Sequence, residues 1–326
     1  MTGSTTDRPK VLYIAGWGRS GTTLLDNLVG SHHGVFTAGE VSYMWRMSFV
    51  EGRLCGCGVP LLDCALWRAI LERAFDGALP DPRRMLELQR TAIPVRRTPS
   101  LVAAAQRGHV DPGVAEYADV LSRIYRAIAA ETGASVVVDA SKRPPDAVAT
   151  ALAAGIDPYL LHMIRDPRAC AFSWQRTMAE PDTPAQSFMT RHGRLMNVGH
   201  WVSWNLASEM VARAYPDGHY QRLRYEDFMA DPRGTMDRVL EFLGEPVVGS
   251  PFVDRRTAHL PGNHTVAGNP KRFRTGEVRI RLDDEWRYRQ SAVDRRTATA
   301  LSLPLLPRYG YRPGVEDDTL VGVGGR

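Results

Sequence analysis

A glycine-rich stretch near the start of the chain has the residue types and spacing of a phosphate-binding loop. Residues 16–23 read GWGRSGTT, follow an apolar run at residues 11–15 and precede a helix predicted to begin at Thr22. Glycines allow a tight turn whose amide groups converge on an anion at the helix N-terminus. The spacing matches the P-loop pattern except that Thr22 replaces its lysine, so the usual grip on Mg·ATP is missing. Arg19 instead places a cation inside the loop, and we expect the loop to bind a phosphate.

Residues 18–25 (GRSGTTLL) resemble the 5′-phosphosulfate loop of the sulfotransferases that use 3′-phosphoadenosine 5′-phosphosulfate, PAPS. In that family the basic residue and the hydroxyl groups of the loop hold the 5′-phosphate and the sulfuryl group. The resemblance implies that six loop residues bind this donor: Gly18, Arg19, Ser20, Gly21, Thr22 and Thr23. The alternative is an ordinary glycine-rich turn without a ligand, which the order of strand, loop and helix disfavours.

A second mark of the family follows the apolar run at residues 159–164. In the family, an arginine at the end of a strand and a serine eight residues later bind the 3′-phosphate, and Arg165 and Ser173 occupy these places. This pair separates PAPS from ATP, which has no 3′-phosphate. The guanidinium fork suits a phosphate, and the carboxyl end of a strand is where α/β folds bind ligands. The alternative is a structural salt bridge between Arg165 and Asp166 or Asp139.

The resemblance also implies three catalytic residues, which are Arg19, Glu40 and Lys142. Residues 19–40 resemble the tyrosylprotein sulfotransferases, in which a glutamate at this place is the proposed general base. A carboxylate that takes the proton of an attacking hydroxyl makes chemical sense. Lys142 follows the apolar run at residues 136–139, where the family has a catalytic histidine or a lysine that stabilises the bridging oxygen. The alternatives are a glutamate stabilised at a helix N-terminus and a solvated loop lysine.

A late basic stretch at residues 268–274 corresponds to the family loop that folds over the nucleotide. The resemblance implies Asn269 and Arg272 as further contacts to the 3′-phosphate, although the local sequence differs from that of the cytosolic enzymes. The alternative is a flexible basic loop. His264 lies just upstream and is a second candidate for the base.

Three of the four cysteines, Cys55, Cys57 and Cys64, fall within ten residues. Structural zinc sites need four ligands, usually in pairs separated by two to four residues, and no histidine lies between these cysteines. The sequence therefore favours a local disulfide or buried thiols over a metal site. Cys170 is expected in the core. Four cysteines, three of them clustered, are too few and too clustered for a secreted disulfide framework.

The elements that must position these residues are predicted from four candidate strands, each followed by a stretch compatible with a helix: residues 11–15, 136–139, 159–164 and 220–225. Alternating strands and helices predict an α/β fold, here a P-loop-like parallel β-sheet flanked by helices. The long interval between the first two runs carries helical spacing at residues 83–90 and 117–130. We expect a helical insertion at about residues 45–130, after the first strand–helix unit. A second helical stretch is predicted at residues 187–215.

No linker composition divides the chain, so the sequence predicts a single domain over residues 1–326 with flexible tails at 1–9 and 312–326. Hydrophobic residues make up 44% and charged residues 24% of the chain, which is typical of a globular protein. The net charge of +5 is diffuse, because 38 of the 41 basic residues are arginine. This pattern argues against a nucleic-acid partner. We also expect no membrane span and no signal peptide, and hence a cytoplasmic protein.

These features together predict a PAPS-dependent sulfotransferase that acts on a hydroxyl of a small-molecule or natural-product acceptor, as in secondary metabolism. No metal is required if cationic side chains neutralise the transferring group. Two alternatives stay open. The first is an atypical P-loop kinase or NTPase, which must function with Thr22 in place of lysine. The second is a non-catalytic nucleotide-binding module, which would leave Glu40 and Lys142 without a role.

Overall fold

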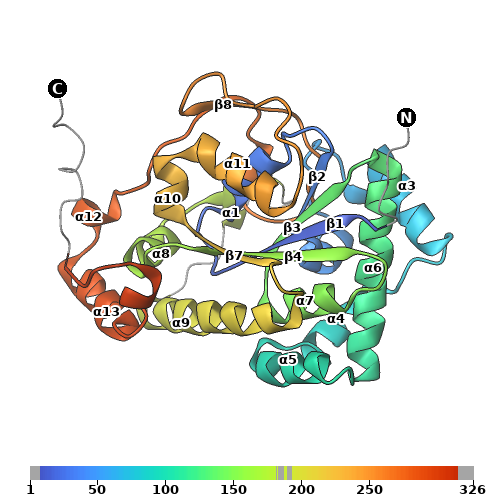
Figure 1. Cartoon of the computed structure of the whole chain (residues 1–326), viewed down its shortest axis with the longest axis horizontal. Coiled ribbons are helices and arrows are strands. Elements are labelled where there is room, and N and C mark those ends of the chain that lie inside the picture. Colours follow the sequence, from blue (N-terminus) through green and yellow to red (C-terminus); the bar gives the residue numbers. More distant parts are fainter. Residues whose placement is uncertain (1–7, 181, 183–186, 189–192, 315–326) are drawn as a thin grey trace.

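The centre of the computed structural model is a five-stranded sheet in which all neighbouring strands are parallel (Figure 1). The structure describes residues 8–180, 182, 187–188 and 193–314. In spatial order the strands are β2 (Val35–Gly39), β3 (Val136–Lys142), β1 (Lys10–Ala15), β4 (Asp157–Ile164) and β7 (Tyr220–Arg224). The predicted α/β fold with a parallel sheet is confirmed.

Helices cover both faces of this sheet, as the continuous apolar strands require. Alternate residues of β1 enter different apolar clusters, with Val11 and Tyr13 on one face and Leu12 and Ile14 on the other. In Figure 1 one face carries α1 (Thr22–Val29), α10 (Tyr225–Ala230) and α11 (Pro232–Phe242). The other face carries α6 (Pro112–Thr132), α7 (Pro144–Leu152) and α9 (Arg194–Val211).

The carboxyl ends of the five parallel strands lie along one edge of the sheet. β1 is central, with β3 on one side and β4 on the other, so the chain direction across the sheet reverses beside β1. Ligands of open α/β sheets bind at such a switch point, just outside the carboxyl ends of the strands. The fold therefore places the segments after β1, β2, β3 and β4 around a common site.

The helical insertion follows β2 and not, as the sequence suggested, the first strand–helix unit. β2 has the sequence VFTAG, in which Thr37 and Gly39 interrupt the apolar pattern that identified the other strands. The insertion contains α2 (Val41–Met44), a π-helical turn (Trp45–Val50), α3 (Ala65–Phe75), α4 (Pro82–Thr91), α5 (Thr98–Gln106) and short turns at Leu61–Asp63 and Val95–Arg97. It ends in α6, which packs on the sheet as the crossover helix to β3.

The predicted helical stretch at residues 187–215 begins too early. Ser187–Phe188 form β6, which pairs antiparallel with β5 (Ala179–Glu180), and the helix itself starts at Arg194. Residues 189–192 lie outside the described part. Most of the two predicted tails, residues 1–7 and 315–326, also lies outside the described part. Pro9, at the end of the first predicted tail, is held by the sheet, because its carbonyl accepts a hydrogen bond from the Asp157 amide of β4.

The C-terminal part adds helices and one small antiparallel sheet. The helices are α8 (Pro167–Gln175), α12 (Trp286–Arg289) and α13 (Ala292–Ser302), with short turns at Ala212–Ala214, Pro270–Phe273 and Pro307–Tyr309. The small sheet pairs β8 (Thr257–Leu260) with β9 (Gly276–Arg279). Between these two strands runs the segment 261–275, called the late loop below. None of the helices in the described part is both long and apolar enough to cross a membrane.

Candidate active site

The loop between β1 and α1 has the backbone of an anion-binding turn. Gly16 and Gly21 have φ angles of +133° and +89°, and Arg19 has φ +71°. A Cβ at Gly16 would lie 2.1 Å from the Met163 carbonyl oxygen on β4, and one at Gly21 would lie 2.7 Å from the Tyr225 ring. Only glycine permits these close approaches. The left-handed φ of Arg19 is uncommon for a side-chain-bearing residue and is a local strain that a functional site can hold.

Arg19 projects from this loop into a largely buried setting. Its guanidinium stacks on the Trp174 ring at 5.0 Å from the centroid, and Nη1 lies 3.6 Å from Met178 Sδ. Burial lowers the pKa of Arg19, and the carboxylates of Glu40 and Glu180 act in the opposite direction. Trp174 also donates from Nε1 to the Gly18 carbonyl at 3.1 Å, which fixes the loop against α8.

Arg165 follows β4 and is 5% exposed. Its Nη1 donates to the Arg19 carbonyl at 3.0 Å, so the second predicted anion contact is joined directly to the first. Its guanidinium lies 4.3 Å from the centroid of the Tyr225 ring. The Nε of Arg165 is buried and has no hydrogen-bond partner among the described residues.

The acidic partner of Arg165 is Asp283, and not Asp166 or Asp139. Arg165 Nη2 lies 3.2 Å from the Asp283 carboxylate, which Arg176 also holds at 3.0 and 3.1 Å. Although burial opposes it, the guanidinium groups of Arg165 and Arg176 hold the pKa of Asp283 below its usual value. Asp283 is thus an ionised carboxylate held between the guanidinium groups of Arg165 and Arg176.

The hydroxyl residues of the predicted site differ in their surroundings. Ser20 and Thr22 are 1% and 3% exposed, and Ser20 Oγ lies 3.7 Å from Cys170 Sγ. Thr23 is half-buried. Ser173 is also half-buried and lies on α8, the helix that begins two residues after Arg165. The structure therefore keeps Ser173 on the element that Arg165 leads into.

Glu40 and Lys142, which are far apart in the sequence, form an ion pair. Glu40 follows β2 and Lys142 ends β3, and these strands are neighbours in the sheet. Lys142 Nζ also donates to the Ala140 carbonyl at 2.8 Å, and the two charged side chains are 11% and 15% exposed. Lys142 has φ +70°, a left-handed conformation that a lysine rarely adopts. Strained, paired and nearly buried charges of this kind are typical of a functional site.

The late loop lies directly against Glu40. The Glu40 amide donates to the Val266 carbonyl at 2.9 Å, and the Val266 amide donates to the Ala38 carbonyl at 2.8 Å. A Cβ at Gly268 would lie 2.7 Å from Glu40 Oε1, so this glycine lets the loop approach the carboxylate. The backbone around Glu40 is therefore held by a segment more than 200 residues further along the chain.

The two late-loop residues proposed from the sequence have structural partners. The Asn269 side chain accepts from the Lys271 amide at 3.0 Å and caps the turn Pro270–Phe273. Arg272 is 2% exposed and donates to the carbonyls of Thr265 and Leu54 at 2.8 and 2.6 Å, while its ion pair with Asp182 measures 2.9 Å. Its described hydrogen bonds hold the late loop to the insertion.

Lys271 is a late-loop cation that the family resemblance does not point to. The residue as a whole is exposed. Partial desolvation lowers the pKa of its ammonium, as do the cationic groups of Arg274, Arg165 and Arg19, while the Asp283 carboxylate acts in the opposite direction. The signal available in the sequence was the rarity of lysine, since the chain uses it only at positions 10, 142 and 271. His264, the second candidate for the base, turns its Nδ1 toward Cys64 Sγ at 3.3 Å.

Known sulfotransferases are similar to this chain in sequence pattern and in fold. The model of the sulfotransferase family matches residues 71–248 of the chain. The sulfotransferase domain from the curacin biosynthetic pathway superposes with a TM-score of 0.50 at 13% identity, covering 94% of this chain and 99% of that one. This likeness shows the fold.

Two further solved structures are similar at lower scores. The sulfotransferase domain of the Synechococcus PCC 7002 olefin synthase has a TM-score of 0.44 and 15% identity, with 96% of this chain and 98% of that chain covered. A sulfotransferase from Alicyclobacillus acidocaldarius also has a TM-score of 0.44, with 14% identity and coverage of 92% and 94%. No curated protein sequence matches significantly.

Proposed function

The chain belongs to the sulfotransferase family, and we propose that it moves a sulfuryl group from PAPS to a hydroxyl of a small-molecule or natural-product acceptor. The observation that carries the choice of donor is the pairing of two anion contacts. Arg165 at the end of β4 donates to the backbone of Arg19 in the glycine loop, which puts both cations at one edge of the sheet. Two linked cations suit a nucleotide with phosphate at both its 5′ and 3′ positions.

The residues of this chain fit such a nucleotide. The loop offers backbone amides in a turn that a Cβ at Gly16 would obstruct, and Arg165 offers a buried Nε with no partner among the described residues. The loop amides and Arg19 would hold the 5′-phosphosulfate. Arg165 would hold the 3′-phosphate, with Ser173 on the helix that follows and Lys271 as an additional cation.

Glu40 and Lys142 would perform the proton and charge chemistry. Bound PAPS would supply an electrophilic sulfuryl group with a phosphate as its leaving group. The Glu40 carboxylate would accept the proton of the acceptor hydroxyl, since a positioned carboxylate is a competent general base. The ammonium of Lys142, which holds Glu40 in the present structure, would neutralise negative charge at the bridging oxygen.

An aromatic wall beside the loop supports an apolar acceptor. The Trp17 ring lies 5.4 Å from Trp174, 5.0 Å from Trp204 and 5.0 Å from His200, measured between centroids. The three tryptophan rings belong to an apolar cluster of the core, and aromatic side chains bind flat or apolar groups through buried area and ring contacts. We therefore propose a phenolic or otherwise partly apolar acceptor.

The two alternative functions account for less of this geometry. A P-loop kinase or NTPase would have to grip its β- and γ-phosphates with Thr22 in place of lysine. A non-catalytic nucleotide-binding module gives no reason for the strained Lys142 or for its buried ion pair with Glu40. Neither alternative explains why a cation follows each of the strands β3 and β4, which flank β1 at the switch point.

The nucleotide selectivity of an Arg165→Lys variant tests the assignment of the 3′-phosphate. Lysine keeps the charge but loses the planar fork, and a lost hydrogen bond to a charged group costs about 1.5–3 kcal/mol, or roughly 10- to 150-fold in affinity. We expect adenosine 3′,5′-bisphosphate to lose that much affinity in a calorimetric titration and 5′-AMP to lose much less. Equal losses for the two nucleotides would contradict the assignment.

Arg168→Lys is the matched control for this experiment. Arg168 is 4% exposed, pairs with Asp166 and lies over the Trp286 ring at 4.9 Å, so its surroundings resemble those of Arg165. Its described partners do not include the glycine loop. The ratio of bisphosphate to 5′-AMP affinity should therefore stay at the wild-type value in this variant.

A further inference from the structure

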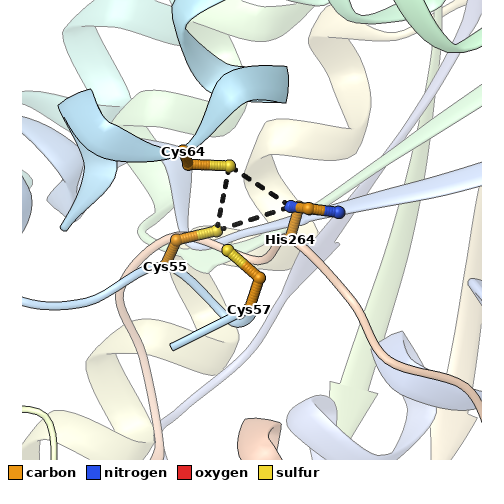
Figure 2. A group of neighbouring side chains, drawn as sticks. All are labelled: Cys55, Cys57, Cys64 and His264. Atoms are coloured by element: carbon orange, nitrogen blue, oxygen red, sulfur yellow. Dashed lines mark hydrogen bonds between the residues drawn. The ribbon is translucent and has the colours of Figure 1, made fainter. Parts of the chain in front are cut away.

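Four potential metal ligands from two distant parts of the chain meet at one point, as Figure 2 shows. They are Cys55, Cys57 and Cys64 of the insertion and His264 of the late loop, and their ligand atoms all lie within 4.8 Å of one another. Cys55 Sγ is 3.8 Å from Cys64 Sγ and 3.8 Å from His264 Nδ1, while Cys64 Sγ is 3.3 Å from His264 Nδ1. All three cysteines are free.

We propose that these four residues form a structural zinc site that joins the insertion to the late loop. A tetrahedral zinc with Zn–S bonds of about 2.3 Å and a Zn–N bond of about 2.0 Å requires S···S separations of about 3.8 Å and S···N separations of about 3.5 Å. The observed distances fall close to both values. Three sulfurs and one imidazole nitrogen are also the soft and borderline donors that favour zinc over magnesium or calcium.

The first two ligands sit on a tight hairpin. The Cys55 amide donates to the Val59 carbonyl at 2.7 Å, and the Gly58 amide donates to the Cys55 carbonyl at 2.8 Å. These bonds turn the short segment Cys55-Gly56-Cys57 back on itself, so that both sulfurs face the same side (Figure 2). Cys57 is exposed, which leaves the hairpin open to an entering ion.

The hairpin and the late loop are fitted closely to each other. A Cβ at Gly56 would lie 2.0 Å from the Asn263 side-chain oxygen, and the Gly56 amide donates to the Thr265 carbonyl at 2.9 Å. Trp67 of α3 donates from Nε1 to the His264 carbonyl at 2.6 Å. The carbonyl groups of His264 and Thr265 are therefore both held by the insertion, as a preformed site needs.

The third cysteine is placed by a helix. Cys64 directly precedes α3, whose N-terminus begins at Ala65. Its Sγ is thereby held 3.8 Å from Cys55 Sγ and 3.3 Å from His264 Nδ1, and the thiolate is the form of cysteine that binds zinc. The thiol protons leave as the metal binds, so binding at neutral pH releases protons to solvent.

Arg272 acquires a role in this arrangement. Three thiolates, a neutral imidazole and Zn²⁺ carry a net charge of about −1. Arg272 donates to the carbonyl of Leu54, which precedes Cys55, and to the carbonyl of Thr265, which follows His264. Its guanidinium thus braces both halves of the site and brings a positive charge beside it. Its ion pair with Asp182 offsets part of that charge.

The site is structural in kind, because four protein ligands leave no open position on a tetrahedral ion. Its effect on the enzyme would pass through the late loop. Val266, two residues after His264, accepts a hydrogen bond from the Glu40 amide. The zinc would therefore fix the position of the late loop where it lies against Glu40, the proposed base. The metal proposal itself does not depend on the proposed donor or acceptor.

The test is the metal content of the full chain, purified under reducing conditions without chelator and measured by plasma mass spectrometry. We expect one zinc per chain. Replacement by Co²⁺ should give the visible ligand-field bands of a tetrahedral ion and a sulfur-to-cobalt charge-transfer band. Cys57→Ser should weaken zinc retention by at least about tenfold, since even indirect ligand partners contribute that much. Cys57 is exposed, so this variant should still fold.

Cys170→Ser is the matched control, because Cys170 is buried elsewhere in the chain and belongs to a different cluster of side chains. It should keep the full zinc equivalent and the cobalt spectrum. A wild-type chain without metal but with a disulfide among Cys55, Cys57 and Cys64 would overturn the proposal. Equal zinc loss in the Cys57→Ser and Cys170→Ser variants would overturn it as well.

Discussion

Replacing Glu40 by glutamine removes the proposed base while keeping its shape. An amide oxygen can still accept the hydrogen bond from Lys142 Nζ, and that ammonium keeps its second bond to the Ala140 carbonyl at 2.8 Å. The Lys142 side chain is 15% exposed, so water can reach it. We expect a loss of folding stability of about 2 kcal/mol, which is typical of weakening one charged hydrogen bond.

The loss in turnover, expressed as a free energy, should be larger than the loss of folding stability and independent of it. General-base catalysis contributes about 10²- to 10⁴-fold, which corresponds to about 3–5 kcal/mol of transition-state stabilisation. The assay is the conversion of PAPS to adenosine 3′,5′-bisphosphate with the fastest acceptor found among phenols, alcohols and sugars. Affinity for the bisphosphate should change by only a few-fold, because Glu40 is not expected to contact it.

Glu180→Gln is the matched control for the change at Glu40. Both glutamates are 8% exposed and ion-paired, Glu180 with Arg53 at 2.8 Å. The control should lose similar stability and keep its turnover within a few-fold of wild type. If Glu40→Gln retains turnover within about threefold, or if both variants lose it equally, Glu40 is not the base.

Three further changes probe the cations, the core and the loop. Lys271→Ala should weaken bisphosphate binding by about tenfold and reduce its salt dependence, while Lys10→Ala, which removes an ion pair with Glu245, should leave calorimetric affinity unchanged. Burial raises the pKa of Asp26 to about 7, so wild-type stability falls as pH rises through that value. Asp26→Asn should therefore gain stability relative to wild type between pH 5 and pH 8, by about 3 kcal/mol in denaturant titrations, and a constant difference would refute the shift. Gly16→Ala should cost more than about 3 kcal/mol, because its Cβ would meet the Met163 carbonyl, whereas Gly52→Ala, with φ +68° in open space, should cost about 1–2 kcal/mol in the same titrations.

The sequence predicted those parts of the fold in which local pattern and packing agree. The strands β1, β3 and β4 are short apolar runs because both faces of a parallel sheet are buried. The edge strand β7, with the sequence YQRLR, is only partly apolar and mostly half-buried. The strand β2 lies at the edge of the sheet, where Val35 and Phe36 are only half-buried, and its Thr37 and Gly39 break the pattern. Its pairing with β3 comes from tertiary contacts that no local signal reveals.

The same limit applies to the two clusters of side chains. Glu40 and Lys142 were selected separately, and only the sheet order, which places β2 beside β3, brings them into contact. The cysteine stretch lacked a fourth ligand within reach in sequence. His264 supplies one from about 200 residues away because the late loop crosses to the insertion. The family resemblance points to Arg272 as a contact to the 3′-phosphate, whereas its placement depends on carbonyl groups that the sequence does not show.

The most direct test of the central claim is a calorimetric comparison of adenosine 3′,5′-bisphosphate, 5′-AMP and Mg·ATP on the unmodified chain. The site joins Arg19 of the glycine loop to Arg165 and lacks the P-loop lysine. It should therefore bind the bisphosphate without added metal and at least about tenfold more tightly than 5′-AMP. Tighter binding of Mg·ATP than of the bisphosphate would contradict a PAPS-dependent sulfotransferase.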